Sequence, residues 1–185
     1  DTGEGDPYYT RPMSPAPADS VNAVELAGRA ATLERRLQLL QLPRLVEAGA
    51  LDGTDVRARL EFGTFDGRTT IAVRIEGDVY LACQRCLKPC ACAVDETASL
   101  AVVANDTDEV PGGYEPLLGD SERLSVVEVI EEQVLLGLPL VPLHETAAKC
   151  GAVAAVLAAV EDEAAVEETQ RPFANLRELL EKGKS

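Results

Sequence analysis

Residues 56–83 read VRARLEFGTFDGRTTIAVRIEGDVYLAC, and their alternation of apolar and polar side chains decides the fold. Three runs, 56–62, 69–76 and 79–83, place apolar residues at every second position, which is typical of half-buried strands. Asp66–Gly67 and Gly77–Asp78 separate the runs and can adopt the positive φ that tight turns need. We therefore predict three strands of an antiparallel meander, with Cys83 ending the third on the core side.

The chain that follows predicts one more strand and one strong helix. Residues 91–104 contain alternating apolar positions and predict the fourth strand, whereas residues 105–119 are polar, broken by Pro and Gly, and predict a loop. Ser125 with Glu128 fits a capping box. A helix is therefore expected to begin at Ser125 and to be ended by Gly137 and Pro139. The apolar stripe is expected at Val126, Val127, Ile130, Val134 and Leu138, with Glu128, Glu131 and Glu132 facing water.

The two ends of the chain are less regular. Residues 1–20 are rich in Pro, Asp and Ser and predict a flexible tail. Residues 22–42 have mixed spacing that fits a helix with an interrupting strand, and Pro43 opens a short helix. Residues 152–168 and 171–180 predict two further helices. The fold class expected is α+β: a meander sheet of about four or more strands packed with a few helices, in a single domain spanning residues 21–185.

Charge is spread unevenly along the chain, whose net charge is −15. Residues 95–168 contain 17 acidic side chains and two basic ones. Nucleic-acid binding draws mainly on clustered Lys and Arg, so this pattern excludes a uniformly basic nucleic-acid binder. The acidic half suits a basic partner such as a ribosomal protein, and it equally suits a surface that only keeps the protein soluble.

Cysteines supply the clearest chemical signal. Cys83-Gln84-Arg85-Cys86 has the spacing with which two thiolates bind one zinc ion. His144 and Cys150 are the expected completing ligands, and Cys90 and Cys92 are alternatives. Two other interpretations stay open: reduced thiols that pack as small core residues, and thiol redox chemistry, which the preceding meander disfavours.

Other features argue against catalysis and against membrane insertion. The chain has one histidine, no glycine-rich phosphate loop and no serine nucleophile motif, so we expect neither an enzyme nor a small-molecule substrate. Five cysteines and the lack of a long apolar run or apolar leader predict a cytoplasmic protein. The basic side chains on the strands and the cysteine turn form a candidate RNA- or partner-binding patch, with ordinary solvent-facing charge as the alternative: Arg57, Arg59, Arg68, Arg74, Arg85 and Lys88.

Several segments, in this order, resemble the YceD family of large ribosomal RNA subunit accumulation proteins. They are LACQRCLKPC, YEPLL, LSVVEVIEEQVLLGLPLVPLHE and RPFANLRELL, and the resemblance covers roughly residues 19–184. The positions that match the family's motifs are Cys83, Arg85, Cys86, Glu131, Leu135, Leu138, Pro139, Pro172, Phe173 and Leu176. After His144 this chain keeps only Cys150 where other members have further cysteines.

The resemblance implies a non-enzymatic factor needed for accumulation of 23S ribosomal RNA in the large subunit. It brings no catalytic residue. We expect the chain to bind precursor ribosomal RNA, a basic large-subunit ribosomal protein, or both. The alternative hypotheses are a zinc-knuckle protein-interaction module without a ribosomal role and a thiol redox protein.

Overall fold

The computed structural model describes residues 19–105, 107–151 and 156. The chain divides into two compact units, residues 1–143 and 144–185. The predicted helices at 152–168 and 171–180 lie outside the described residues except for Val156, as does the predicted tail except for Asp19 and Ser20.

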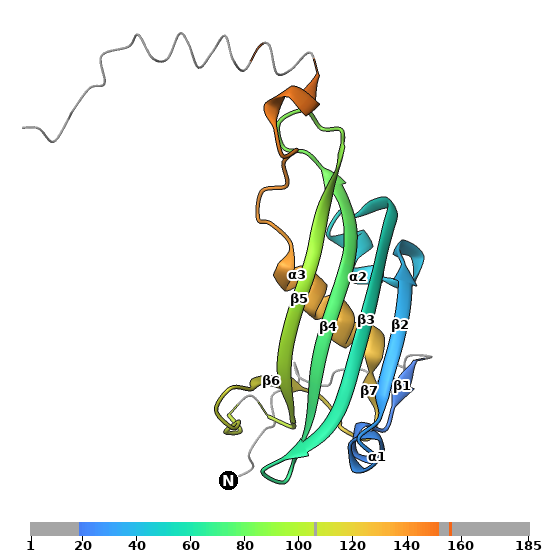
Figure 1. Ribbon diagram of the computed structural model, residues 1–185, viewed down its shortest axis with the longest axis vertical. Coiled ribbons are helices and arrows are strands. Elements are labelled where there is room, and N and C mark those ends of the chain that lie inside the picture. The colour runs from blue at the N-terminus through green and yellow to red at the C-terminus, as the bar shows by residue number, and fades with distance from the viewer. Residues whose placement is uncertain (1–18, 106, 152–155, 157–185) are drawn as a thin grey trace, which may run out of the picture. The chain divides into compact units, whose positions relative to one another are not determined.

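The first unit is built on a five-stranded sheet (Figure 1). Its strands, in both chain and spatial order, are β2 (Thr32–Gln38), β3 (Leu51–Phe65), β4 (Arg68–Ala82), β5 (Pro89–Val103) and β6 (Glu115–Leu118). The first four pair antiparallel, which confirms the predicted meander. Strand β6 pairs parallel with β5 and lies where the sequence predicted only a loop.

The prediction of a turn at Gly77–Asp78 was wrong, because β4 runs straight through both residues. Gly77 pairs with Val56 on β3 and with Val94 on β5. A Cβ atom at Gly77 would lie 2.3 Å from the carbonyl oxygen of Asp55. The glycine is therefore needed for close approach of two strands and not for a reversal of the chain.

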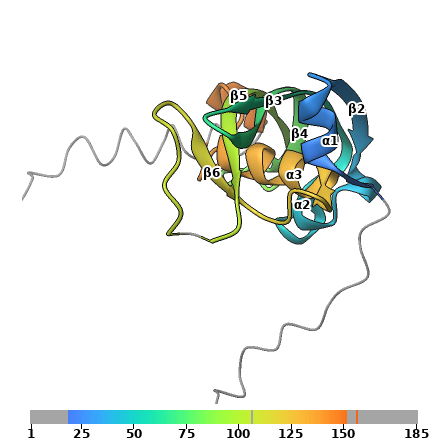
Figure 2. The same ribbon diagram turned by 90° about the horizontal axis from the view of Figure 1, so that it is seen from below.

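Helices α1 (Ala23–Gly28), α2 (Pro43–Glu47) and α3 (Val126–Gly137) lie on one side of this sheet (Figure 2). A second, two-stranded antiparallel sheet pairs β1 (Ser20–Val21) with β7 (Leu124–Ser125). A short 3-10 helix, η1 (Leu39–Gln41), joins β2 to α2. The mixed pattern at 22–42 thus resolves into a helix followed by a strand. The α+β class predicted from the sequence is confirmed.

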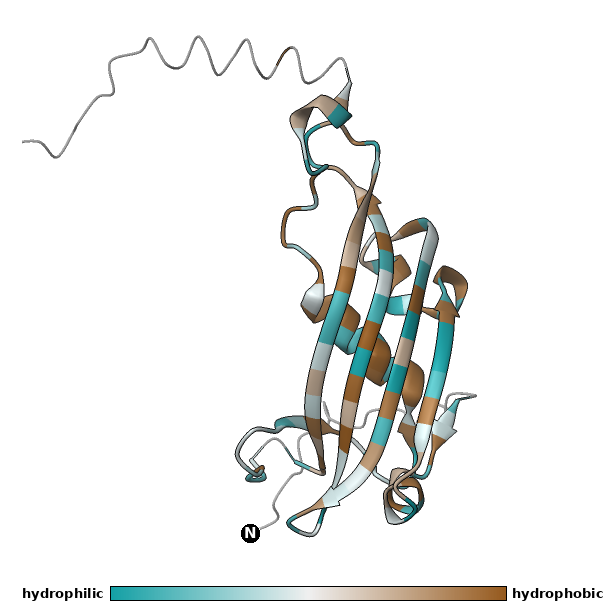
Figure 3. Ribbon diagram, viewed as in Figure 1, coloured by the Kyte–Doolittle hydropathy of each residue, from teal (hydrophilic) through white to brown (hydrophobic). Residues whose placement is uncertain are grey.

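The core lies between the sheet and helix α3. Strands β3 and β4 alternate hydrophobic and hydrophilic residues along their length (Figure 3). The predicted inward positions are buried, each with 7% or less of its surface exposed: Val56, Ala58, Leu60, Phe62, Ile71, Val73, Ile75, Val79, Leu81 and Cys83. Period-2 alternation therefore identified the buried face of these strands correctly.

Helix α3 begins and ends where the sequence predicted. Ser125 is its N-cap, and the hydroxyl oxygen accepts a hydrogen bond from the backbone N–H of Glu128 at 3.3 Å. Val126, Ile130 and Val134 are fully buried. Glu131, predicted to face water, is only 1% exposed, which corrects that prediction.

Candidate metal centre

The knuckle, residues Cys83–Lys88, is the turn that joins β4 to β5. The backbone N–H of Cys83 donates to the Lys88 carbonyl oxygen at 2.9 Å, and that of Leu87 donates to the Cys83 carbonyl oxygen at 2.8 Å. Leu87 takes a φ of +60°, a backbone conformation that residues other than glycine rarely adopt. These constraints fix the loop and place Cys83 in a buried and Cys86 in a half-buried position.

The segment that follows α3 passes beside the knuckle. The backbone N–H of Gln84 donates a hydrogen bond to the carbonyl oxygen of Pro142 at 2.9 Å. Prolines 139 and 142 keep this segment extended, because each restricts the residue before it. An apolar groove lies here, lined by Ala48, Gly49, Leu81, Ala82, Gln84, Leu135, Leu138, Pro139, Leu140 and Pro142.

The described start of the second unit carries the other two predicted ligands. A 3-10 helix, η2 (Ala147–Cys150), turns the chain so that Cys150 lies back beside His144. The Cys150 Sγ and His144 Nδ1 atoms are 3.6 Å apart. Cys150 is buried and His144 is half-buried.

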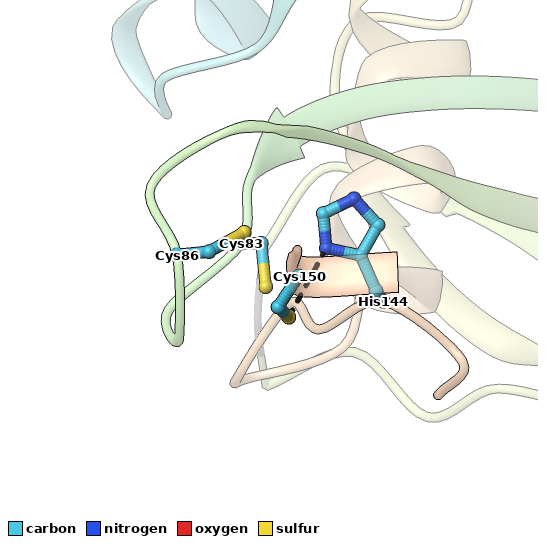
Figure 4. A group of neighbouring side chains, drawn as sticks. All are labelled: Cys83, Cys86, His144 and Cys150. Carbon is cyan, nitrogen blue, oxygen red and sulfur yellow. Dashed lines mark hydrogen bonds between the residues drawn. The ribbon is translucent and has the colours of Figure 1, made fainter. Parts of the chain in front are cut away.

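One group of potential ligands stands out within the described residues. The ligand atoms of Cys83, Cys86, His144 and Cys150 all lie within 4.8 Å of one another (Figure 4). Four ligands around a tetrahedral zinc, with bonds of about 2.0 to 2.3 Å, would lie roughly 3.5 Å apart, so a modest contraction would close the site. Three thiols and one imidazole form a donor set that zinc prefers. This group can hold a metal ion.

Cys90 and Cys92, the alternative ligands, lie outside this group. Both are buried on the inner face of β5, and the Cys90 thiol donates to the carbonyl oxygen of Leu81 at 3.4 Å. Burial raises the pKa of the Cys90 thiol to about 11, and burial also raises the pKa of Cys92. Both thiols are therefore protonated at neutral pH and poorly suited to nucleophilic or redox chemistry.

The predicted basic patch is split between two places. Arg57, Arg59 and Arg74 share the exposed face of the sheet, where the pairing register sets Arg36 opposite Arg57 and Arg59 opposite Arg74. Carboxylates surround them: Arg59 pairs with Glu34 and Glu61, Arg74 with Glu76 and Asp95, and Arg36 with Asp55. This face is a network of ion pairs and not an open basic surface.

Arg85 and Lys88 lie apart from that face, on the knuckle. Both side chains are exposed, and within the described part of the chain neither forms an ion pair. Two of the predicted RNA- or partner-binding residues on the sheet, Arg59 and Arg74, are thus neutralised by carboxylates, whereas Arg57 on the same face forms no ion pair within the described residues. Arg85 and Lys88 form a separate, unneutralised pair beside the metal-ligand group.

Glu131 is the site residue whose environment the sequence prediction missed. Its carboxylate accepts hydrogen bonds from the backbone N–H groups of Arg44 (2.8 Å) and Leu45 (3.4 Å) in the first turn of α2. Burial raises the pKa of Glu131, and these hydrogen bonds oppose that rise. Helical spacing offered a signal, because position 131 falls one turn after Val127 and one turn before Val134, on the apolar stripe.

Comparison with known proteins places this arrangement in a family. The sequence profile of the large ribosomal RNA subunit accumulation protein YceD matches residues 71–180, more than half of the chain. The chain belongs to the YceD family. The match spans β4 from Ile71 onward, the knuckle, β5, helix α3, His144 and Cys150. It therefore contains all four potential metal ligands of this YceD chain.

A curated relative agrees with this assignment. The large ribosomal RNA subunit accumulation protein YceD of Haemophilus influenzae is 29% identical over 110 residues. These residues are 57% of this chain and 63% of the relative, so the match covers less than two thirds of the relative's length. No solved structure matches the chain.

Residues carried over from YceD motifs have different places in the fold. Leu135, Leu138 and Pro139 line the apolar groove beside the knuckle, and Glu131 caps α2. Pro172, Phe173 and Leu176 lie outside the described residues. Among the described helices, none has the length and apolarity needed to cross a membrane.

Proposed function

We propose that this chain is a non-enzymatic ribosome biogenesis factor that supports accumulation of 23S ribosomal RNA in the large subunit. The observation that carries the proposal is the YceD match over residues 71–180. The name of the Haemophilus influenzae relative points the same way. The protein acts in the cytoplasm, on macromolecules and not on a small-molecule substrate.

Its partners are precursor ribosomal RNA, a basic large-subunit ribosomal protein, or both. A net charge of −15 favours a basic protein over most of the surface, because opposite charge speeds encounter and like charge repels RNA. Even on the sheet face, Arg36, Arg59 and Arg74 are matched by carboxylates, and Arg57 lies opposite Glu76 in the strand register. RNA would therefore bind at positions where basic side chains are not paired with carboxylates.

Zinc is the metal that the four-ligand group suits. Cys83, Cys86, His144 and Cys150 would hold it, and zinc bound by four protein side chains has no open position for a substrate or a reactive water. The ion would cross-link the β4–β5 turn to residues 144–150 and so contribute folding free energy. This role is structural and agrees with a non-enzymatic function.

The test is the ratio of large-subunit to small-subunit ribosomal RNA in source cells that lack this gene. Complementation would use the wild-type gene and a C83S/C86S double variant expressed to the same level. A fall in the ratio that only the wild type restores supports both the ribosomal role and a need for the metal-ligand group. Restoration by the double variant would leave the ribosomal role standing and remove the ligand group from it.

The compact Cys₃His group favours a second candidate, a zinc-knuckle protein-interaction module without a ribosomal role. The same experiment distinguishes the two. An unchanged ratio on deletion, together with a stoichiometric zinc content in the purified protein, would favour the interaction module.

A further inference from the structure

We infer that the knuckle is the RNA contact of this protein, with Arg85 and Lys88 binding the phosphate backbone and the arginines of the sheet face taking no part. This inference rests on the proposed function and deepens it, because it chooses between the two sets of basic residues. Three observations carry it.

The first observation is the distribution of ion pairs. Most described arginines are held by carboxylates, including Arg36, Arg59 and Arg74 at 2.7, 2.8 and 2.6 Å. A guanidinium already held by carboxylates has less to gain from a phosphate, since it must exchange one anion for another. Arg85 and Lys88 make no such exchange, because neither is ion-paired in the described structure.

The second observation is the absence of acidic residues from the stretch of sequence that contains the knuckle. Between Asp78 and Asp95 the sequence contains Arg85 and Lys88 and no Asp or Glu. Arg57, which also lacks an ion pair among the described residues, lies on the sheet face beside Asp55 and opposite Glu76. In a chain of net charge −15, the knuckle is thus a locally positive surface segment.

The third observation is that the segment next to the knuckle is uncharged and apolar. The segment held to the knuckle by the bond from Gln84 to Pro142 runs from Leu138 to Leu143 and contains no charged residue. Leu87 and Leu140 are 76% and 102% exposed. This segment offers the cations no competing carboxylate, and its apolar side chains weaken the local screening of their attraction to phosphate.

The geometry of the knuckle also preorganises both cations. Its two backbone hydrogen bonds and the positive φ of Leu87 fix the loop that carries Arg85 and Lys88. A fixed loop loses less conformational entropy on binding than a mobile one. Arg85 and Lys88 are three residues apart on this one loop.

The experiment uses the full-length chain and fluorescein-labelled single-stranded poly(U) RNA, with binding followed by fluorescence anisotropy across a salt series. The test variant is R85Q/K88Q, and the matched control is R57Q/R59Q, which removes the same charge from the sheet face. We expect R85Q/K88Q to weaken binding at least fivefold at about 50 mM salt and to reduce the salt slope by roughly 1.4, whereas R57Q/R59Q binds like the wild type. Thermal unfolding of both variants checks that each is folded, and R85K/K88R, which keeps both charges, should retain binding.

Four results would overturn the inference. They are equal weakening by both double variants, weakening by R57Q/R59Q alone, loss of binding in R85K/K88R while that variant stays folded, and no RNA binding by the wild type. Co-sedimentation of the wild-type chain with large-subunit precursor particles tests the proposed function separately from the knuckle contact. If the chain binds the particles but not RNA, the knuckle contact is overturned and the proposed function stands. If the chain binds neither, both the knuckle contact and the proposed function are contradicted.

Discussion

Glu131 on helix α3 caps helix α2, a segment 87 residues earlier in the chain: its Oε1 atom accepts a hydrogen bond from the backbone N–H of Arg44 at 2.8 Å. The N-cap residue of α2, Leu42, has no side chain able to do this. Glu132, the next residue, forms an ion pair with the Arg44 side chain at 2.6 Å. Two adjacent glutamates therefore fasten α2 to α3.

Replacing Glu131 by Ala should destabilise the protein by about 2 kcal/mol, because it leaves one part-buried and one buried N–H group of α2 without an acceptor. Glu131→Gln keeps an oxygen at the same place and should cost much less. Urea unfolding at neutral pH measures both. Equal losses for Ala and Gln would show that the charge, and not the cap, is what matters.

The raised pKa of Glu131 predicts a pH dependence of stability. Burial favours the protonated carboxyl in the folded state, so the folded chain keeps this proton above the ordinary value of 4.5 while the unfolded chain loses it. The contribution of Glu131 to the free energy of unfolding is therefore largest below 4.5 and falls as pH rises through the folded pKa. Unfolding free energies between about pH 4 and 7 should show Glu131→Gln gaining on the wild type as pH rises. If the difference in unfolding free energy between Glu131→Gln and the wild type stayed constant across this pH range, Glu131 would not have a raised pKa in the folded state.

Zinc binding should depend on the four-ligand group and not on the other buried thiols. We expect about one zinc ion per purified chain, lost in Cys83→Ser and in Cys150→Ser. Cys92→Ala is the matched control, since Cys92 is buried nearby in sequence but lies outside the group. Elemental analysis with thermal unfolding before and after chelation measures the effect. Zinc retained in Cys150→Ser, or lost in Cys92→Ala, would contradict this ligand set.

Gly77→Ala should destabilise the sheet by about 2 to 3 kcal/mol, because the new Cβ would meet the backbone of β3, 2.3 Å from Asp55 O and 2.9 Å from Val56 Cα. Gly67→Ala is the comparison. Gly67 has a φ of +72° with no atom within 4 Å of its Cβ position, so only backbone strain of about 1 kcal/mol applies. Chemical unfolding of both variants measures the difference. If Gly77→Ala lost less free energy of unfolding than Gly67→Ala, the backbone of β3 would be able to shift away from the new Cβ at little cost.

Local patterns in the sequence were sufficient wherever neighbouring residues decide the structure. Alternation identified the buried faces of β3 and β4, and Ser125 marked the start of α3. The cysteine spacing, with His144 and Cys150, identified the four potential ligands that the fold brings together. These features depend on side-chain period and short-range hydrogen bonds, which are written directly in the sequence.

Contacts between distant segments were not predictable in the same way. Gly77–Asp78 has the composition of a turn, yet β4 continues through both residues, which pair with β3 and β5 on either side. A glutamate on a helix normally faces water, yet the uncapped start of α2 holds Glu131 in the core. Arginines on alternate strand positions resemble a basic patch until the register of neighbouring strands sets Glu34 beside Arg59 and Asp95 beside Arg74.

The sequence by itself thus determined the buried faces of β3 and β4, the main helix and the set of potential thiol and imidazole ligands. The tertiary structure alone decided which charges are neutralised and which remain on the surface. The physical reason is that electrostatic and hydrogen-bond partners are chosen by distance in space. Here Glu131 binds Arg44, and Glu34 binds Arg59, from 25 or more residues away.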